Sequence, residues 1–433
     1  MSGGDLFSAL QDDLVQHVLS FLPSRDAVKS ATLSRRWRHL WRSTPAVRVR
    51  GDGDAFRLFV NTLLIHRDGA SPLRLFEIDA AGLLIRPSRP GYDSDEDGDY
   101  DDYDYYNEER KVVDPYIDMW IRHAVSTCRA RSLTACFKGV DTMWSPPQPP
   151  PFASSPHLTT MHLQGVKLAH GLLDFSCCPA LLHLTLRACR LHGEAFVAPS
   201  LERLSIIDSD IQDGCGEEDS MTPTRICAPS LRYLQLSDEN SDWDPSPTAP
   251  SLESLPLLTS ASIQLSGDTQ ICYEDTTRSL LLHGLSEATS LELIASTTQG
   301  REILLRDLTW CPVFTKLKTL ILNEWCVYDD VTALACLMRH TPRIEDLILV
   351  LNFKMPPISK VKTEGIYITS EHPFLTYEHL KTVEIKKCRR CYEARVNEIL
   401  KLFSDCGIPS SKIRIRYKKS QGQPSKQRKF HSV

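Results

Sequence analysis

The chain lacks the segments that carry proteins into or across membranes. Its 433 residues contain no uninterrupted apolar run that approaches the roughly 18 residues a membrane-spanning helix requires. The first residues, MSGGDLFSALQDDL, have neither the basic region nor the apolar stretch of a secretory signal. We therefore expect no membrane partner and a location in the cytosol, the nucleus or both.

Cysteines are too few for a disulfide framework, since 14 of them are spread over the whole chain. Most fall within apolar patterns, where a free thiol packs as a small hydrophobic group. Cys388 and Cys391 have the spacing of half a zinc site, but no second pair or matched histidines follow at the required spacing. The sequence therefore predicts no metal site and no cofactor, and it indicates a reducing compartment.

Catalytic motifs are also missing. The sequence has no nucleophile elbow, no phosphate-binding loop, no zinc-protease motif and no dinucleotide-binding glycine pattern. The net charge of −5 favours neither nucleic acid nor an acidic membrane surface as a partner. The basic residues 419–433 form no patterned face with interleaved aromatic side chains, so nucleic-acid binding is not expected. Nothing in these features supports an enzyme.

Residues 5–50 begin with an apolar pattern at helical spacing. Leu14, Val18 and Leu22 fall on one broad stripe together with Val15 and Leu19. Pro23 ends this helix, and shorter helices are expected after Ser24 and around Trp37. Three short helices bury little surface, so they need a further partner for their apolar residues. Periodicity alone leaves two alternatives open, a cap on the following domain or a docking module for another protein.

The residues themselves resemble the F-box, particularly its plant form. The specific segment is LSRRWRHLW, Leu33 to Trp41, which follows Leu22-Pro23 at the family's spacing. Gln11 stands where the family usually has a proline that preorganises the first helical turn. The resemblance implies binding to a Skp-type adaptor, which joins the chain to a cullin scaffold. The adaptor-facing positions that it implies are Leu10, Leu14, Val18, Leu19, Leu22, Pro23, Val28, Leu33 and Trp37.

A short apolar pattern recurs through residues 51–370. It consists of an apolar residue, two others, an apolar residue, one other and an apolar residue, at intervals of about 20–30 residues, which is typical of leucine-rich repeats. Each copy supplies one strand that cannot bury its apolar face alone, so neighbouring copies stack into a parallel sheet. Between 258 and 316 the pattern blurs, although Ile263 and Leu291 mark further candidate strands. The copies begin at Leu73, Leu158, Leu181, Leu201, Leu231, Leu252, Leu317, Ile344 and Leu380.

Residues 371–418 parse as strand, helix and strand. The helix carries Tyr392, Val396, Ile399 and Phe403 on one face, and Ile413 begins the alternation of the final strand. This segment resembles the FBD region of plant F-box/leucine-rich-repeat proteins. A closing helix and strand is also what a solenoid needs to cover its last apolar face. The predicted fold class is therefore α/β, with a three-helix F-box, an irregular leucine-rich-repeat solenoid and a strand–helix–strand cap.

Three segments interrupt or follow these patterns. The acidic residues 91–109 match the start of a calcium-binding loop, but Asp104 stands where such a loop needs a glutamate, so we expect a solvated insertion. Residues 145–152, SPPQPPPF, are expected to form a stiff loop between repeats, with recognition by a proline-binding domain as the alternative. The basic residues 419–433 are expected to be a flexible tail.

Taken together, these patterns favour a non-catalytic substrate receptor of an SCF-type ubiquitin ligase. In this interpretation the F-box binds the adaptor and the repeats hold a target protein for ubiquitination. The alternative is an interaction scaffold that uses the same repeats without any ligase. Candidate target-binding residues are those that lie between the apolar positions of the central repeats, namely Thr159, His162, His183, Thr185, Arg203, Arg232 and Gln235.

Overall fold

The computed structural model describes most of the chain outside several insertions and the two ends. Every helix in these residues is too short or too polar to cross a lipid bilayer. The acidic segment 91–109 and the basic tail 419–433 lie outside the described residues, so the predictions for them stay untested. The described ranges are 10–69, 71–80, 115–137, 143–153, 155–169, 171–212, 223–238, 249–265, 281–351, 377–388 and 393–417.

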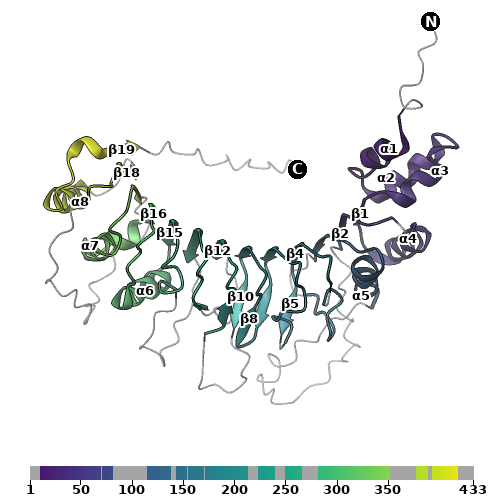
Figure 1. Cartoon of the computed structure of the whole chain (residues 1–433), viewed down its shortest axis with the longest axis horizontal. Coiled ribbons are helices and arrows are strands. Elements are labelled where there is room, and N and C mark those ends of the chain that lie inside the picture. The colour runs from purple at the N-terminus through teal and green to yellow at the C-terminus, as the bar shows by residue number, and fades with distance from the viewer. Residues whose placement is uncertain are drawn as a thin grey trace, which may run out of the picture.

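The N-terminal helices form a small unit at one end of the molecule (Figure 1). Helix α1 ends before Pro23, because proline cannot continue a helix. Helix α2 begins directly after Pro23, since proline is well tolerated at the start of a helix. Ser34 precedes the third helix, and its Oγ accepts a hydrogen bond from the Trp37 amide at 3.3 Å. The elements are α1 Asp12–Leu19, α2 Ser24–Lys29 with a 3₁₀ turn Ser30–Thr32, and α3 Trp37–Leu40 with a 3₁₀ turn Trp41–Ser43.

A 13-stranded parallel sheet forms the body of the protein and lines the inner side of its curve (Figure 1). Each strand pairs with the corresponding strand of the next repeat, as the spacing of the apolar pattern predicts. In sheet order the strands are β1 Ala46–Arg50, β2 Leu75–Asp79, β3 Ser132–Cys136, β4 Thr160–Gln164, β6 His183–Arg187, β9 Arg203–Ile207, β12 Tyr233–Asp238, β14 Ser260–Leu265, β15 Ser290–Ala295, β16 Thr319–Asn323, β17 Asp346–Leu351, β18 Thr382–Lys387 and β19 Ile413–Tyr417.

The outer side of the curve differs between the middle and the ends of the solenoid. Helices cover the ends, whereas two small parallel sheets cover the middle (Figure 1). The helices are α4 Gly53–His66, α5 Pro115–Arg122 with a π-helical turn His123–Thr127, α6 Thr298–Asp307, α7 Thr332–Arg339 and α8 Glu393–Asp405, with further 3₁₀ turns at Leu308–Trp310, Glu324–Val327 and Ser410–Lys412. The small sheets join β5 Lys167–Ala169, β7 Arg190–His192 and β10 Asp210–Gln212, and β8 Ala195–Val197, β11 Arg225–Cys227 and β13 Ser251–Leu252.

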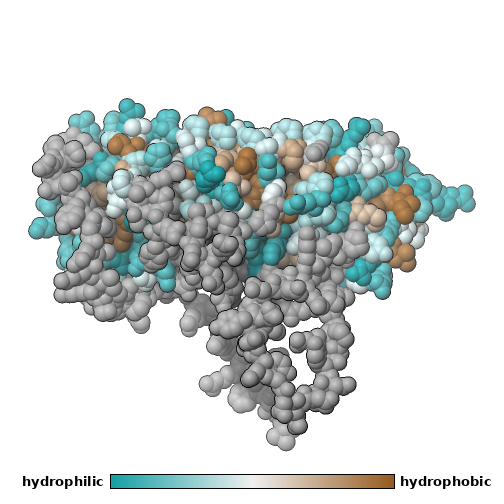
Figure 2. All heavy atoms as spheres, turned by 90° about the horizontal axis from the view of Figure 1, so that it is seen from below, coloured by the Kyte–Doolittle hydropathy of each residue, from teal (hydrophilic) through white to brown (hydrophobic). Residues whose placement is uncertain are grey.

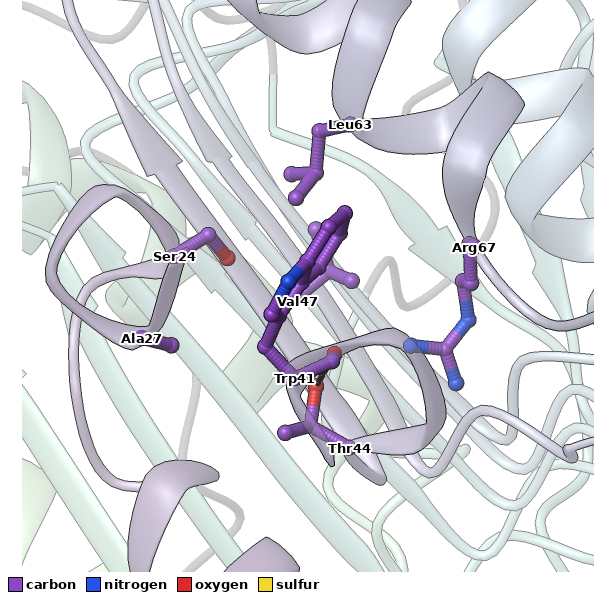
Figure 3. A pocket seen from close by; sticks show the side chains of 7 residues that line it. All are labelled: Ser24, Ala27, Trp41, Thr44, Val47, Leu63 and Arg67. Atoms are coloured by element: carbon purple, nitrogen blue, oxygen red, sulfur yellow. Dashed lines mark hydrogen bonds between the residues drawn. The ribbon is translucent and has the colours of Figure 1, made fainter. Parts of the chain in front are cut away.

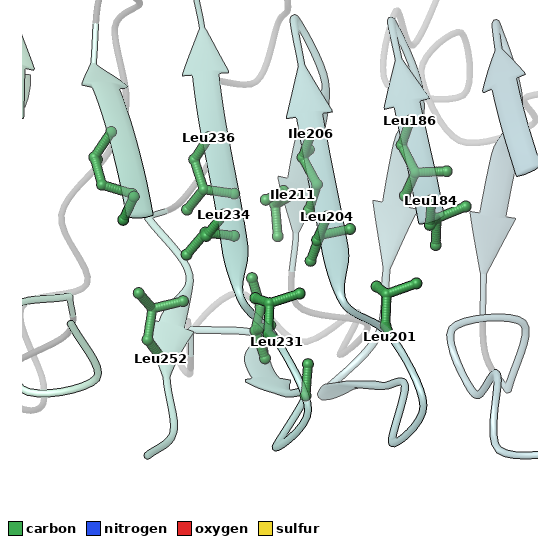
Figure 4. Packing of buried hydrophobic residues seen from close by; sticks show 14 of the residues in the cluster. Leu184, Leu186, Leu201, Leu204, Ile206, Ile211, Leu231, Leu234, Leu236 and Leu252 are labelled. Carbon is green, nitrogen blue, oxygen red and sulfur yellow. The ribbon is translucent and has the colours of Figure 1, made fainter. Parts of the chain in front are cut away.

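The core is a stack of aliphatic rows that run from repeat to repeat. Leu204 and Ile206 of β9 point to the same side as Leu234 and Leu236 of β12 (Figure 4). Strand alternation directs them away from the inner face. Burial of each leucine or isoleucine contributes roughly 1.5–3 kcal/mol, and this gain exists only when the neighbouring repeat is present. Seen from the outer side, the coloured surface is largely hydrophilic with separate small hydrophobic groups (Figure 2).

The predicted repeats agree with the structure except at one copy. All the other copies coincide with strands of the main sheet, and the weaker candidates at Ile263 and Leu291 are the strands β14 and β15. The copy at Leu252 is displaced, because Leu252 lies in a small sheet and Leu257 is exposed. The main strand of that repeat comes later and buries Ala261 and Ile263. Ala261 occupies a position where the other copies mostly have leucine, so the apolar pattern of this repeat is weak in the sequence.

The predicted strand–helix–strand cap consists of β18, α8 and β19. Arg395 of α8 donates hydrogen bonds to the carbonyl oxygens of Tyr328 and Asp329 at 3.2 and 2.8 Å, which fastens the helix to the segment between β16 and α7. Strand β19 ends the sheet and carries exposed charges at Arg414 and Arg416. Charged side chains on an edge strand discourage pairing with another chain. The exact domain boundaries, 5–50, 51–370 and 371–418, remain predictions.

The proline-rich residues 145–152 lie against the body rather than apart from it. Trp144 forms a parallel bridge with Val166, and Phe152 is fully buried. The Trp144 amide donates a hydrogen bond to the carbonyl oxygen of Gly165. At Gly165, φ is +70° and an added Cβ would lie 1.9 Å from the Phe137 carbonyl oxygen. Only glycine fits there.

We predict that Asn323→Ala destabilises the solenoid by about 2–4 kcal/mol. The buried Asn323 side chain accepts from the Ala295 amide at 3.0 Å and donates to the Ala295 carbonyl at 2.8 Å, so it extends the β15–β16 ladder. Its removal leaves both groups of Ala295 buried without these partners. Urea unfolding of the full chain measures the loss, and Thr319→Ala on the half-exposed face of the same strand is the control, with an expected change below about 0.5 kcal/mol.

Candidate functional site

The N-terminal helices close a small core of their own. Val15 and Leu19 of α1, Ala27 of α2 and Leu40 of α3 are buried, and Leu10, Trp37 and Trp41 pack around them. Leu19 is 1% exposed. Leu19 was predicted to face the adaptor, but in the structure its side chain lies inside the core of the helical unit.

Other apolar side chains of the same helices remain uncovered. Leu14 and Val18 are a helical turn apart on α1 and about half exposed, and Leu22 is exposed in the turn that follows the helix. Phe21 and Leu33 are 67% and 72% exposed. Phe21 was not among the predicted positions, although its spacing of seven residues from Leu14 places it on the same helix face. Such a group of exposed apolar side chains marks an interaction surface.

The remaining predicted adaptor positions divide between surface and interior. Pro23 is exposed. Leu10 and Trp37 are half-buried against the small core, and Val28 is half-buried against the core of the solenoid. The structure therefore brings Leu14, Val18, Leu22, Pro23 and Leu33 to the surface, and we call these residues together with Phe21 the apolar face.

A polar clamp fixes the start of α1. The Arg36 guanidinium donates to the Asp12 carboxylate at 2.7 Å through Nε and to the Leu10 carbonyl oxygen. This contact joins the arginine-rich segment to the first helical turn across 24 residues of sequence. Gln11 adopts a φ of −67°, close to the value that proline fixes, so the missing family proline leaves the backbone path unchanged.

A joint connects the helical unit to the first repeat. Ser24 Oγ accepts a hydrogen bond from the Arg48 amide of β1 at 2.9 Å, and the Asp68 amide donates to the Arg42 carbonyl at 3.1 Å. Trp41 lies at the centre of a small cavity between α2, β1 and α4 (Figure 3). The joint makes the helical unit and the solenoid one body. The residues that line the cavity are Ser24, Ala27, Trp41, Thr44, Val47, Leu63 and Arg67.

On the inner face of the sheet, solvent-facing side chains form rows, because the parallel register aligns the strands. The middle row runs from one end of the solenoid to the other and is half-exposed over most of its length. It consists of Arg48, Glu77, Thr134, His162, Thr185, Ser205, Gln235, Ser262, Glu292, Ile321, Ile348, Glu384 and Arg414.

The structure gathers most of the predicted target-binding residues on this face. His162, Thr185 and Gln235 belong to the middle row, and His183 pairs with Arg203 in the adjacent row. Burial, followed by the charge of Arg187, lowers the pKa of His162, so its imidazole is neutral near pH 7. Thr159 and Arg232 do not join these residues. They precede their strands, where Thr159 donates to the Arg131 carbonyl and Arg232 lies 4.0 Å from Glu202.

The chemistry of the inner face changes along the solenoid. Over the central strands it is polar, and its polar run ends at Glu292, which accepts a hydrogen bond from Ser262 at 2.7 Å. Beyond it Ile321 and Ile348 are directly paired across β16 and β17. They form a half-exposed aliphatic patch, defined by Ile294, Ile321, Ile348 and Val350, which the sequence prediction did not include. From the sequence alone, a solvent-facing aliphatic residue in a strand cannot be distinguished from a core residue, because the face that it occupies is unknown.

The described residues contain one group of side chains that could hold a metal ion. It consists of Cys311, Cys336 and His340, and it lies on the outer side of the solenoid, away from both surfaces described above. The sequence prediction of no metal site did not consider this group.

Comparison with known proteins identifies the N-terminal helical unit. The F-box domain model matches residues 7–46. The chain is 27% identical over 370 residues to the meiotic F-box protein MOF of Oryza sativa subsp. japonica, covering 80% of this chain and 71% of that protein. It is 25% identical over 415 residues to an F-box/FBD/LRR-repeat protein of Arabidopsis thaliana, covering 91% of this chain and 89% of the relative.

The F-box region is more similar than the rest. A segment of 41 residues is 58% identical to an F-box/LRR-repeat protein of Arabidopsis thaliana, although it covers only 10% of this chain and 8% of that protein. The chain thus carries an N-terminal F-box followed by a parallel-strand repeat body. Its relatives are plant F-box/FBD/LRR-repeat proteins at modest identity over most of the chain. F-box domains generally bind Skp-type adaptors, which supports a general role as a substrate adaptor.

We predict that Leu19→Ala destabilises the helical unit by about 2–5 kcal/mol, whereas Leu14→Ala changes its stability by less than about 0.5 kcal/mol. Leu19 fills the small core, and Leu14 is 51% exposed. Hydrogen exchange of the α1 amides in the full chain measures both effects. Equal protection in the two variants would mean that Leu19 does not hold the core.

Proposed function

We propose that the chain is the substrate-recognition subunit of an SCF-type ubiquitin ligase. The observation that carries this proposal is the apolar face, which stays exposed although the helices already have a closed core. Burial of this face against a Skp-type adaptor would join the chain to a cullin. The inner face of the sheet would hold a target protein. The chain would act by raising the local concentration of target lysines beside the ubiquitin carrier, without covalent chemistry of its own.

The joint supports this mechanism. The hydrogen bond from the Arg48 amide to the Ser24 hydroxyl and the backbone hydrogen bond from Asp68 to Arg42 join the F-box helices to the first repeat, and they would fix the orientation of the solenoid relative to the adaptor. Proximity accelerates a transfer only when the two reacting groups are held in a defined arrangement. A solenoid on a free linker would spread the target over a much larger volume.

The aliphatic patch defines the chemistry of the target. Ile321 and Ile348 lie among the acidic side chains Glu292, Asp346 and Glu384 of the neighbouring inner-face positions. An apolar anchor in a polar rim is the usual arrangement of an interface that carries binding energy. Lys386 lies beside Val350 and 3.7 Å from Glu384, so the rim holds charges of both signs. We propose that the target presents apolar side chains surrounded by polar and charged residues. The cysteines in the described residues are all free, which supports action in the cytosol, the nucleus or both.

We predict that the double substitution Leu14→Ala and Phe21→Ala lowers the affinity for a purified Skp-type adaptor at least about 10-fold, because two apolar anchors are lost. Surface plasmon resonance with the full chain measures the change. Leu58→Ala with Ile65→Ala removes equally exposed apolar side chains from α4 and is the matched control, with unchanged affinity. Undiminished binding by the first variant would refute adaptor docking through the apolar face.

We predict that Ile348→Lys abolishes capture of the target without affecting the adaptor. Ile348 is half-exposed in the free chain, so a lysine there would be buried only by the bound target, at a cost of several kcal/mol unless it found a partner. Quantitative mass spectrometry of proteins bound to the full chain measures the loss, and Leu257→Lys at an exposed site outside the sheet is the control. Captured proteins that depend on Ile348 should also lose ubiquitination in the Leu14→Ala and Phe21→Ala variant. Retained ubiquitination would favour the alternative of a scaffold without ligase function.

A further inference from the structure

Two consecutive repeats bring two thiols and an imidazole together on the outer side of the solenoid. Cys311 follows the 3₁₀ turn that ends α6, whereas Cys336 lies on α7 and His340 is its C-cap residue. Cys336 and His340 are four residues apart, so the helix places them on one face. One ligand atom from each of the three side chains lies within 4.8 Å of the others.

Backbone contacts hold this arrangement in place. The Phe314 amide donates to the His340 carbonyl at 2.8 Å, and the Cys311 amide donates to the Leu308 carbonyl at 3.2 Å. These bonds tie the segment after α6 to the end of α7. The three side chains therefore do not depend on a flexible loop for their approach.

The distances are close to those of a metal centre. Sγ of Cys336 and Nδ1 of His340 are 3.8 Å apart. A tetrahedral zinc ion with bonds of about 2.3 Å to sulfur and 2.0 Å to nitrogen holds such atoms roughly 3.5 Å apart. Nδ1 also lies 2.9 Å from the Cys336 carbonyl oxygen. An ion bound through Nδ1 would replace this contact with the carbonyl oxygen.

The partial exposure of two of the three side chains and the chemical types of all three favour a bound metal ion. Cys336 is buried, while Cys311 and His340 are half-exposed, so an ion can enter and a water molecule can complete its coordination. Thiolate and imidazole ligands together are the donor set that zinc prefers.

We propose that Cys311, Cys336 and His340 bind one zinc ion, with water as the fourth ligand. Both cysteines bind as thiolates and release their protons to solvent, the histidine binds through a neutral nitrogen, and no redox change takes place. The ion joins the end of α6 to the end of α7 and thereby fastens two adjacent repeats. The proposal does not depend on adaptor or target binding.

The test uses the full chain in the presence of a non-thiol reductant, which keeps the cysteines from forming a disulfide. We expect one zinc per chain by elemental analysis after dialysis. Addition of Co²⁺ to the zinc-free chain should produce the thiolate-to-cobalt charge-transfer absorption and visible bands of a tetrahedral site, and Zn²⁺ should displace them. Zinc should also raise the melting temperature.

Variants decide whether the three residues are the ligands. Cys336→Ser and His340→Gln should each abolish the cobalt absorption and the zinc-dependent rise in melting temperature. Cys177→Ser removes an exposed thiol from another repeat and should leave both unchanged. If Cys336→Ser fails to fold, Cys311→Ser at the half-exposed position carries the same test. Absence of the absorption in the unmodified chain, or its persistence in a folded ligand variant, would overturn the proposal.

Discussion

The parallel register of the main sheet is the constraint on which the rest of the structure depends. Each strand buries its alternate side chains only because the strands on both sides continue the same rows, as β12 does between β9 and β14. A shift by one residue would send the leucines to the solvent side. The same register aligns the outward residues into rows, so the burial of the core and the layout of the inner face have one physical origin.

The ends of this sheet explain the two terminal units. At the first strand, the Arg48 amide of β1 donates a hydrogen bond to the Ser24 side chain of the F-box helices, whose own core is too small to be stable alone. At the last strand, α8 buries Val396, Ile399 and Phe403 in the end of the solenoid core, and β19 exposes charged residues at the edge. The F-box helices thus form the N-terminal cap of the solenoid, and this role is compatible with the docking role that helical periodicity left open as the alternative.

The inner and outer faces are suited to different tasks. The inner face is continuous, because neighbouring strands place their middle residues side by side, and it changes from polar to aliphatic near Ile321. A surface of this kind can follow an extended partner. The outer face is built from separate turns and helices, and it brings residues of two repeats together only locally, as at Cys311 and Cys336. Such local contacts join repeats to each other rather than to a partner.

Periodicity in the sequence was sufficient to determine the class of fold, most repeat strands and the closing cap, whereas the F-box was identified from its resemblance to that family. These features depend on local patterns, because an apolar residue at every second position indicates a strand and one at every third to fourth position indicates a helix. Tertiary structure alone decided which apolar residues face inward. Leu19 and Leu14 lie on the same predicted stripe, yet only Leu19 meets the other helices. It also decided that Ile321 and Ile348 lie on the surface, that the Leu252 copy is displaced, and that Cys311 meets His340. The physical reason is that burial and side-chain contacts depend on what packs against a segment from elsewhere in the chain, and no local pattern contains that information.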